Sequence, residues 1–275
     1  MSHIPSLSFL TLHDVAPTAA IQAAAEAGFQ KLGLRLLPAN PQAEAPYPLL
    51  TDDTLLRETL SVLSDTGLQV ADIEMVRLNA TTTRDDYAAL LVRAAALSAG
   101  NILVVGDDTD EVRLTEKYAE FAEVAAGYKI NAALEFMPFT GVPDLATAQR
   151  IVDAVNTPNA TIIIDALHVH RSGTTCDEIA ALPVHQIAYG QLCDGPVPFD
   201  PSREELTRIA RTSRNFPGEG GIDLMELVKA LPEDLLISVE VPDVEFARTA
   251  SPVERAKRAF ETATSTLAKA GHAWA

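Results

Sequence analysis

Short apolar runs and longer amphipathic stretches alternate along almost the whole chain, and this alternation limits the possible folds more than any other feature. The apolar runs favour β-strands, and the stretches between them repeat apolar residues at helical spacing. Strands that alternate with helices form a parallel sheet whose crossover connections are the helices. Eight strands are expected, at residues 6–12, 31–37, 69–78, 101–106, 129–137, 160–167, 185–192 and 235–241. Eight such units in 275 residues predict an α/β fold, a single (β/α)8 TIM barrel that occupies residues 1–275 as one domain.

An open, doubly wound sheet is the competing fold. Such sheets usually carry a glycine-rich phosphate loop directly after the first strand. Here the first strand ends in TLHDVAPTAA, which contains no glycine. The proline-rich stretch at residues 37–48 lies between a strand and its helix, so we interpret it as a long loop and not as a domain boundary. The closed barrel is therefore the preferred fold.

Charge and composition exclude several classes of partner. The formal net charge is −17, and nucleic acids and anionic membranes both bind basic surfaces, so neither is expected to bind this chain. No apolar stretch reaches the roughly 20 residues that span a bilayer, and the first residues do not resemble a signal peptide. The two cysteines are expected to be reduced thiols, which fits a cytoplasmic protein. The oligomeric state stays open, with a homo-oligomer among the alternatives.

Polar side chains stand at the carboxyl ends of the last four expected strands, where TIM barrels place their chemistry. Glu135 ends the fifth strand, Asp165 the sixth, Gln191 the seventh and Glu240 the eighth. A buried carboxylate costs several kcal/mol unless it is paired or bound to a metal, and too few basic residues stand nearby to pair all three. One carboxylate alone could belong to a structural ion pair. The set as a whole favours a divalent cation, and oxygen ligands favour Mg²⁺ or Mn²⁺.

Other residues are candidates for contact with a substrate. His168 follows Asp165 by three residues and could reach a substrate hydroxyl, although it could also cap a loop. His13 and Glu74 stand near the ends of the first and third expected strands. In the loop SRNFPGEGGIDL at residues 213–224, Arg214 is a candidate clamp for an anionic or keto oxygen, and Glu219 is a weaker candidate. A tight turn with an exposed Arg214 is the alternative.

The ordered motifs EFMPF, IIIDALHVHRSG, YGQLCDG, RNFPGEGGIDL and ISVEVP resemble the xylose isomerase-like TIM-barrel superfamily, which includes sugar phosphate isomerases and epimerases. The resemblance implies one divalent metal held by Glu135, Asp165, Gln191 and Glu240. Most epimerases of the superfamily have His where this chain has Gln191. Bacterial 3-dehydroshikimate dehydratases of the same superfamily use Gln there, and their D-x-x-H segment and F-P-G-x-G loop are similar to those of this chain.

The resemblance implies chemistry that begins with removal of a proton from a carbon next to a carbonyl. We expect a metal-dependent isomerase or epimerase of a keto-sugar, sugar phosphate or inosose-like substrate, with Glu135 and Glu240 as acid/base groups and His168 holding or protonating an oxygen. The alternative is a lyase that dehydrates a cyclic hydroxy-ketone such as a 3-dehydroshikimate-like acid, with His168 as the base. A third hypothesis is a barrel without catalytic activity that binds a polyol or serves as a partner subunit. The DNA-repair branch of the superfamily is excluded, because it needs many histidines and a surface that does not repel DNA.

Overall fold

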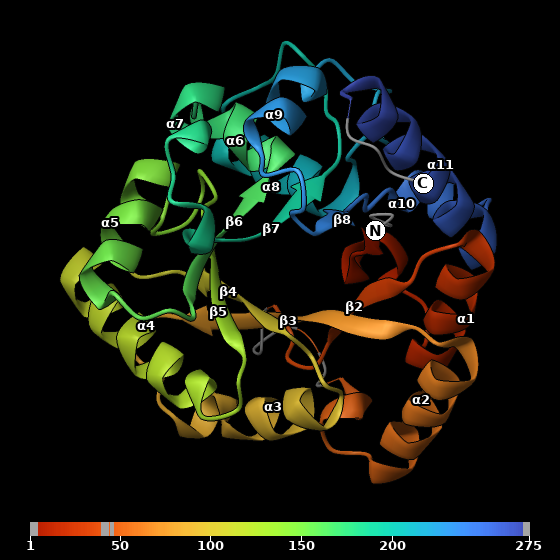
Figure 1. The fold of residues 1–275 in the computed structure, drawn as a ribbon, viewed down its shortest axis with the longest axis horizontal. Coiled ribbons are helices and arrows are strands. Elements are labelled where there is room, and N and C mark those ends of the chain that lie inside the picture. The colour runs from red at the N-terminus through yellow and green to blue at the C-terminus, as the bar shows by residue number, and fades with distance from the viewer. Residues whose placement is uncertain (1–4, 40–43, 45–46, 272–275) are drawn as a thin grey trace.

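The computed structural model describes residues 5–39, 44 and 47–271. Eight parallel strands close into a barrel in sequence order, and β8 pairs with β1 through Ser6–Ser238 and Leu7–Val239. The helices surround the strands, as Figure 1 shows. The strands are β1 (Ser6–Leu7), β2 (Lys31–Arg35), β3 (Gln69–Leu78), β4 (Asn101–Gly106), β5 (Asn131–Glu135), β6 (Ala160–Asp165), β7 (Ile187–Leu192) and β8 (Ile237–Val239). The predicted (β/α)8 TIM barrel is confirmed.

The helices follow the strands in the order that the alternation predicts. They are α1 (Pro17–Ala27), α2 (Asp53–Thr66), α3 (Asp85–Ala96), α4 (Glu111–Ala126), α5 (Leu145–Val155), α6 (Ala166–Ser172), α7 (Cys176–Ala180), α8 (Arg203–Thr212), α9 (Leu224–Ala230), α10 (Val244–Ala247) and α11 (Pro252–Lys269), with short 3-10 helices at Phe9–Leu12, Pro48–Leu50 and Val184–Gln186. Asp and Ser side chains cap many of the amino ends, among them Asp52, Asp144 and Ser251. Within the described residues, no helix combines the length and apolarity needed to cross a membrane.

The first strand is shorter than the sequence predicts. The prediction of a strand over residues 6–12 is wrong beyond Leu7, because Phe9–Leu12 forms a 3-10 helix. Thr11 is the physical reason. Its hydroxyl donates to the carbonyl oxygen of Val239 at 2.9 Å and accepts from the amide of Val241 at 3.0 Å, so the chain bends across the end of β8. The long loop predicted at residues 37–48 lies partly outside the described residues, at 40–43 and 45–46.

The inside of the barrel carries polar side chains from its middle to its carboxyl end. Asp72 and Glu74 share one face of β3, because side chains alternate along a strand, and both are buried. Gly33 on β2 makes room for the first of them, since a Cβ atom at that position would lie 2.9 Å from the Asp72 carboxylate. Barrel interiors are usually packed with branched apolar side chains. Polar residues therefore mark this end of the barrel as the place to look for chemistry.

Candidate active site

A cavity of about 220 Å³ opens at the carboxyl ends of the strands. Of the residues expected from the sequence, it is lined by His13, Glu74, Glu135, His168, Arg214 and Glu240. Two more of the expected residues, Asp165 and Gln191, are buried and contact Arg214 and Glu240 respectively. Apolar side chains such as Met75, Met137 and Phe139 complete the lining. One mouth of the barrel therefore gathers residues that are widely separated in the sequence.

Arg214 connects two of the expected metal ligands. Its Nη1 lies 2.5 Å from Asp165 Oδ2, and its Nη2 lies 2.6 Å from Glu240 Oε2. Its Nε donates to the carbonyl oxygen of Ala210 at 2.9 Å, which fixes the plane of the guanidinium group. Arg214 is 3% exposed, so it does not stand at an exposed turn. The guanidinium group supplies part of the positive charge that these buried carboxylates require.

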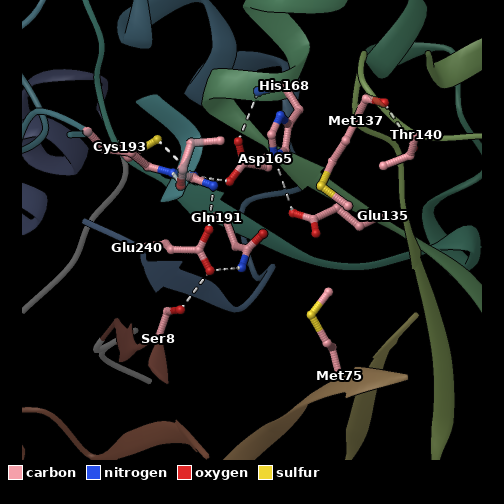
Figure 2. A network of polar contacts seen from close by, with 12 residues as sticks. Ser8, Met75, Glu135, Met137, Thr140, Asp165, His168, Gln191, Cys193 and Glu240 are labelled. Atoms are coloured by element: carbon pink, nitrogen blue, oxygen red, sulfur yellow. Dashed lines mark hydrogen bonds and ion pairs between the residues drawn. The ribbon is translucent and has the colours of Figure 1, made fainter. Parts of the chain in front are cut away.

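The other oxygen of Glu240 belongs to a second set of contacts (Figure 2). Glu240 Oε1 accepts from Gln191 Nε2 at 2.7 Å and lies 2.8 Å from Ser8 Oγ. Ser8 Oγ is also 2.8 Å from Glu74 Oε1. A hydroxyl group has one proton to donate, so a proton on one of the two carboxyl groups completes the second contact. Burial raises the pKa of Glu240 to about 7, against the lowering effect of Arg214, so this carboxyl group is a suitable holder of that proton.

Glu135 and His168 form the opposite wall. His168 Nε2 lies 3.9 Å from Glu135 Oε1, and the His168 ring packs edge-on against Phe139. The backbone amide of His168 donates to Asp165 Oδ1 at 2.9 Å, so the carboxylate caps α6 and ends β6 at the same time. Burial lowers the pKa of His168 to about 4, so its imidazole is neutral at pH 7. Burial, with nearby Glu240 and Asp165, raises the pKa of Glu135 well above its usual range.

The arrangement fits a divalent cation. Glu135 Oε1 and Gln191 Oε1 are buried and have no hydrogen-bond partner in the described part of the chain. Candidate ligand atoms of Glu135, Asp165 and His168 all lie within 4.8 Å of one another. Buried polar atoms without a partner are rare in folded proteins and often mark an ion or a water molecule. Carboxylate and amide oxygens are the ligands that Mg²⁺ and Mn²⁺ prefer.

Comparison with known proteins identifies the family. Residues 21–266 match the model of the xylose isomerase-like TIM barrel family. The chain belongs to this family. The proteins similar to this chain include an inosose isomerase, and its fold neighbours include a D-psicose 3-epimerase and a probable dehydratase.

A sequence relative and two solved structures of similar fold resemble this xylose isomerase-like barrel. An inosose isomerase of Bacillus licheniformis is 26% identical over 162 residues, which cover 56% of this chain and 55% of that protein. The crystal structure of the IolI protein with a bound zinc atom has a TM-score of 0.79 at 18% identity and covers 98% of this chain and 99% of its own. AsbF of Bacillus anthracis, a probable 3-DHS dehydratase involved in petrobactin synthesis, has a TM-score of 0.73 at 19% identity and covers 93% and 97%.

The remaining expected residues of this xylose isomerase-like barrel lie in different places. His13 is half-buried at the cavity, with its Nδ1 3.2 Å from the Leu10 carbonyl oxygen. Glu74 lines the cavity and forms an ion pair with Arg35 at 2.8 Å. Glu219 is exposed outside the cavity and pairs with Arg258 at 2.7 Å. The reason lies in Asp194, whose carboxylate accepts from the backbone amides of Gly218 and Ile222 and so holds the loop with Glu219 on its outer side.

Sequence reasoning missed several polar residues in or beside the site, among them Ser8, Glu44, Asp72 and Arg211. Asp72 is buried, its Oδ1 has no hydrogen-bond partner among the described residues, and burial next to Glu74 raises its pKa well above the usual range. A two-residue periodicity could have revealed it, because Asp72 precedes Glu74 by two residues and must share its face of the strand. Ser8 had no such indication, since the role of its hydroxyl depends on two carboxylates from distant strands.

The neutral state of His168 predicts a pH dependence of stability. Its pKa falls from 6.5 to about 4 on folding, so the unfolded chain binds a proton that the folded protein excludes. The contribution of the neutral imidazole to the free energy of unfolding is fully present above pH 6.5 and is lost as the pH falls towards 4. Between pH 7 and pH 4.5, the free energy of unfolding of wild type should fall by about 2–3 kcal/mol more than that of a His168→Asn variant. Urea denaturation at both pH values measures this, and equal losses would contradict it.

Proposed function

We propose that this protein is a divalent-metal-dependent isomerase or epimerase that acts on a keto-sugar, sugar phosphate or inosose-like substrate through an enediolate. The observation that carries the proposal is the position of a neutral, buried His168 with its Nε2 3.9 Å from Glu135 Oε1, beside carboxylate and amide oxygens suited to a cation. The family match and the similarity to an inosose isomerase support the same class of reaction.

Glu135, Asp165, Gln191 and Glu240 would hold Mg²⁺ or Mn²⁺. When bound, such an ion polarises the substrate carbonyl and stabilises negative charge on its oxygen. Asp165 and Glu240 each keep one oxygen on Arg214, so the guanidinium group orients these two side chains. The Gln191 amide donates to Glu240 and leaves its own oxygen free of hydrogen bonds within the described chain. The protein thus supplies an oriented set of oxygens without crowding the cavity with further charge.

Proton transfer is assigned to the two walls of the cavity. Glu135, or Glu240 on the opposite side, removes the proton from the carbon next to the carbonyl. The pKa of each carboxyl group is raised, and a carboxylate with a raised pKa is a stronger base than an ordinary one. Neutral His168 can donate a hydrogen bond or a proton to the substrate oxygen. Return of the proton to the same carbon from the other face gives an epimer, and its return to the neighbouring carbon gives an isomer.

A lyase is the second candidate. Two features favour it: Gln191, because the dehydratases that this chain resembles have Gln at that position, and neutral His168. A neutral imidazole can accept the substrate proton, after which loss of a β-hydroxyl group as water completes a dehydration. The fold neighbour AsbF is described as a probable dehydratase, which supports this alternative only at the level of fold.

Incubation with candidate substrates in deuterated water tests both functions. The protein is loaded with Mg²⁺ or Mn²⁺ and given a ketose, an inosose and 3-dehydroshikimate in turn. Deuterium in a product of unchanged formula supports the isomerase or epimerase, whereas loss of water supports the lyase. Wild-type protein that binds neither ion in calorimetric titration, and exchanges no proton on any of these compounds, would contradict both.

A further inference from the structure

Four arginines line the cavity, although the chain as a whole has a formal net charge of −17. They are Arg35, Arg77, Arg211 and Arg214. Arg35 and Arg214 are buried at the inner end, where each is bound to a carboxylate. The other two stand at the outer rim and differ in their partners.

The two rim arginines are not equivalent. Arg77 is half-buried, binds Asp107 at 2.9 Å and donates to the carbonyl oxygen of Ala39 at 3.1 Å. Arg211 lies in the last turn of α8, is exposed at the rim, and has no hydrogen bond or ion pair to any residue that the structure describes. Its guanidinium group is therefore free to bind a molecule that enters the cavity.

Two arginines and two carboxylates surround Arg211, and neither carboxylate forms an ion pair with it in the described part of the chain. Partial desolvation at the cavity, with Arg77 and Arg35 as neighbours of like charge, lowers the pKa of Arg211, and Glu44 and Asp107 act in the opposite direction. Asp107 is already bound by Arg77. An anion placed here would relieve the repulsion among the arginines, and a guanidinium group presents paired N–H donors that match carboxylate and phosphate oxygens.

The cavity carries different side chains in different parts. Glu135, Glu240 and His168 are buried, Arg211 is exposed with Arg77 and Glu44 as charged neighbours, and apolar side chains complete the lining. Met75 and Met137 belong to this apolar part, and Figure 2 shows both side chains extending towards Glu135. A ligand that fits has oxygen donors at one end and an anionic group at the other, separated by a carbon framework.

We propose that Arg211 is a specificity-determining residue that binds an anionic group of the substrate, either a carboxylate or a phosphate, at the rim of the cavity. The substrate is then an acidic hydroxy-ketone or a ketose phosphate, and a neutral ketose binds poorly. This inference rests on the proposed function for the placement of the keto and hydroxyl oxygens at the inner end.

Calorimetric binding of three probes to the Mn²⁺-loaded protein tests this inference. The probes are 3-dehydroshikimate as a carboxylate, D-fructose 6-phosphate as a phosphate, and D-fructose as a neutral ketose. We expect at least one anionic probe to bind wild type about tenfold or more tightly than D-fructose, and Arg211→Gln to weaken that probe about 10- to 100-fold. Binding of D-fructose should change less than about twofold. Which anionic probe responds identifies the group as carboxylate or phosphate.

Two further variants separate charge from packing. Arg211→Lys keeps the charge and should recover part of the affinity for the anionic probe, because a single ammonium group replaces a two-pronged contact. Arg203→Gln removes an exposed arginine from the opposite end of the same helix and should leave all three affinities unchanged. Equal weakening of anionic and neutral probes by Arg211→Gln, or tight binding of D-fructose to wild type, would overturn the inference.

Failure of this inference and failure of the proposed function give different results. If wild type showed no Mn²⁺ binding or no deuterium exchange, and anion binding still depended on Arg211, the result would count against the proposed function alone. Mn²⁺ binding and deuterium exchange that persist unchanged in Arg211→Gln, with no change in the affinity of either anionic probe, would count against Arg211 alone.

Discussion

Glu135→Gln should reduce metal-dependent proton exchange by about 10³-fold or more and leave the fold intact. The carboxylate is both an expected ligand and a candidate acid/base group, and loss of a general base alone usually costs 10²- to 10⁴-fold. Stability should be unchanged or greater. The pKa of Glu135 is raised on folding, so its charged form costs stability at neutral pH, and a neutral amide removes that cost. Deuterium incorporation and thermal unfolding measure the two effects.

Glu219→Gln is the matched control for this prediction. Glu219 is a glutamate of the same predicted set, but it is exposed, lies outside the cavity and pairs with Arg258. Exchange in this variant should equal that of wild type. If Glu135→Gln kept activity within about tenfold of wild type, Glu135 would be neither a required ligand nor the base.

Arg214→Met should lower the free energy of unfolding of the metal-free protein by about 3–5 kcal/mol at pH 8. The guanidinium group contacts Asp165 and Glu240 at 2.5 and 2.6 Å inside the barrel, and its removal leaves two buried carboxylates without this positively charged partner. A divalent ion would then compensate them. Millimolar Mn²⁺ should therefore stabilise Arg214→Met more than it stabilises wild type, as measured by urea denaturation with and without the ion.

Arg248→Met provides the comparison. Arg248 pairs with Glu245 at 2.8 Å, and both side chains are exposed, so its removal should change stability by less than about 0.5 kcal/mol. Similar losses in the two variants would show that Arg214 does not neutralise buried charge. A loss in Arg214→Met that Mn²⁺ does not reduce further than in wild type would show that these carboxylates do not attract the ion.

Much of the fold could be predicted because the pattern is local. An apolar run such as TIIID can be recognised within a few residues, and cap residues such as Asp52 and Ser251 define helix ends without any knowledge of distant parts. The prediction of the first strand was wrong beyond Leu7 for a non-local reason. Residues 9–12 look like a continuing strand, but the contacts of Thr11 with the end of β8 turn them into a 3-10 helix.

The candidate site follows the same division. Glu135, Asp165, Gln191 and Glu240 could be found because parallel strands of a barrel all end at one mouth. Glu219 was misleading because its position beside Arg214 and several glycines gave no information about the carboxylate of Asp194, which holds that loop.

By itself, the sequence determined the closed barrel and the strand ends that carry its carboxylates, since strand periodicity fixes which face each side chain takes. Only the tertiary structure decided what those side chains contact. Arg214 is 49 residues from Asp165, and Ser8 is 232 residues from Glu240. A long, charged side chain has many rotamers, and the choice among them depends on the charges that barrel closure places around it. For that reason Arg214 could be named as a candidate from the sequence, whereas its position between two carboxylates, and the lack of a partner for Arg211 among the described residues, could not.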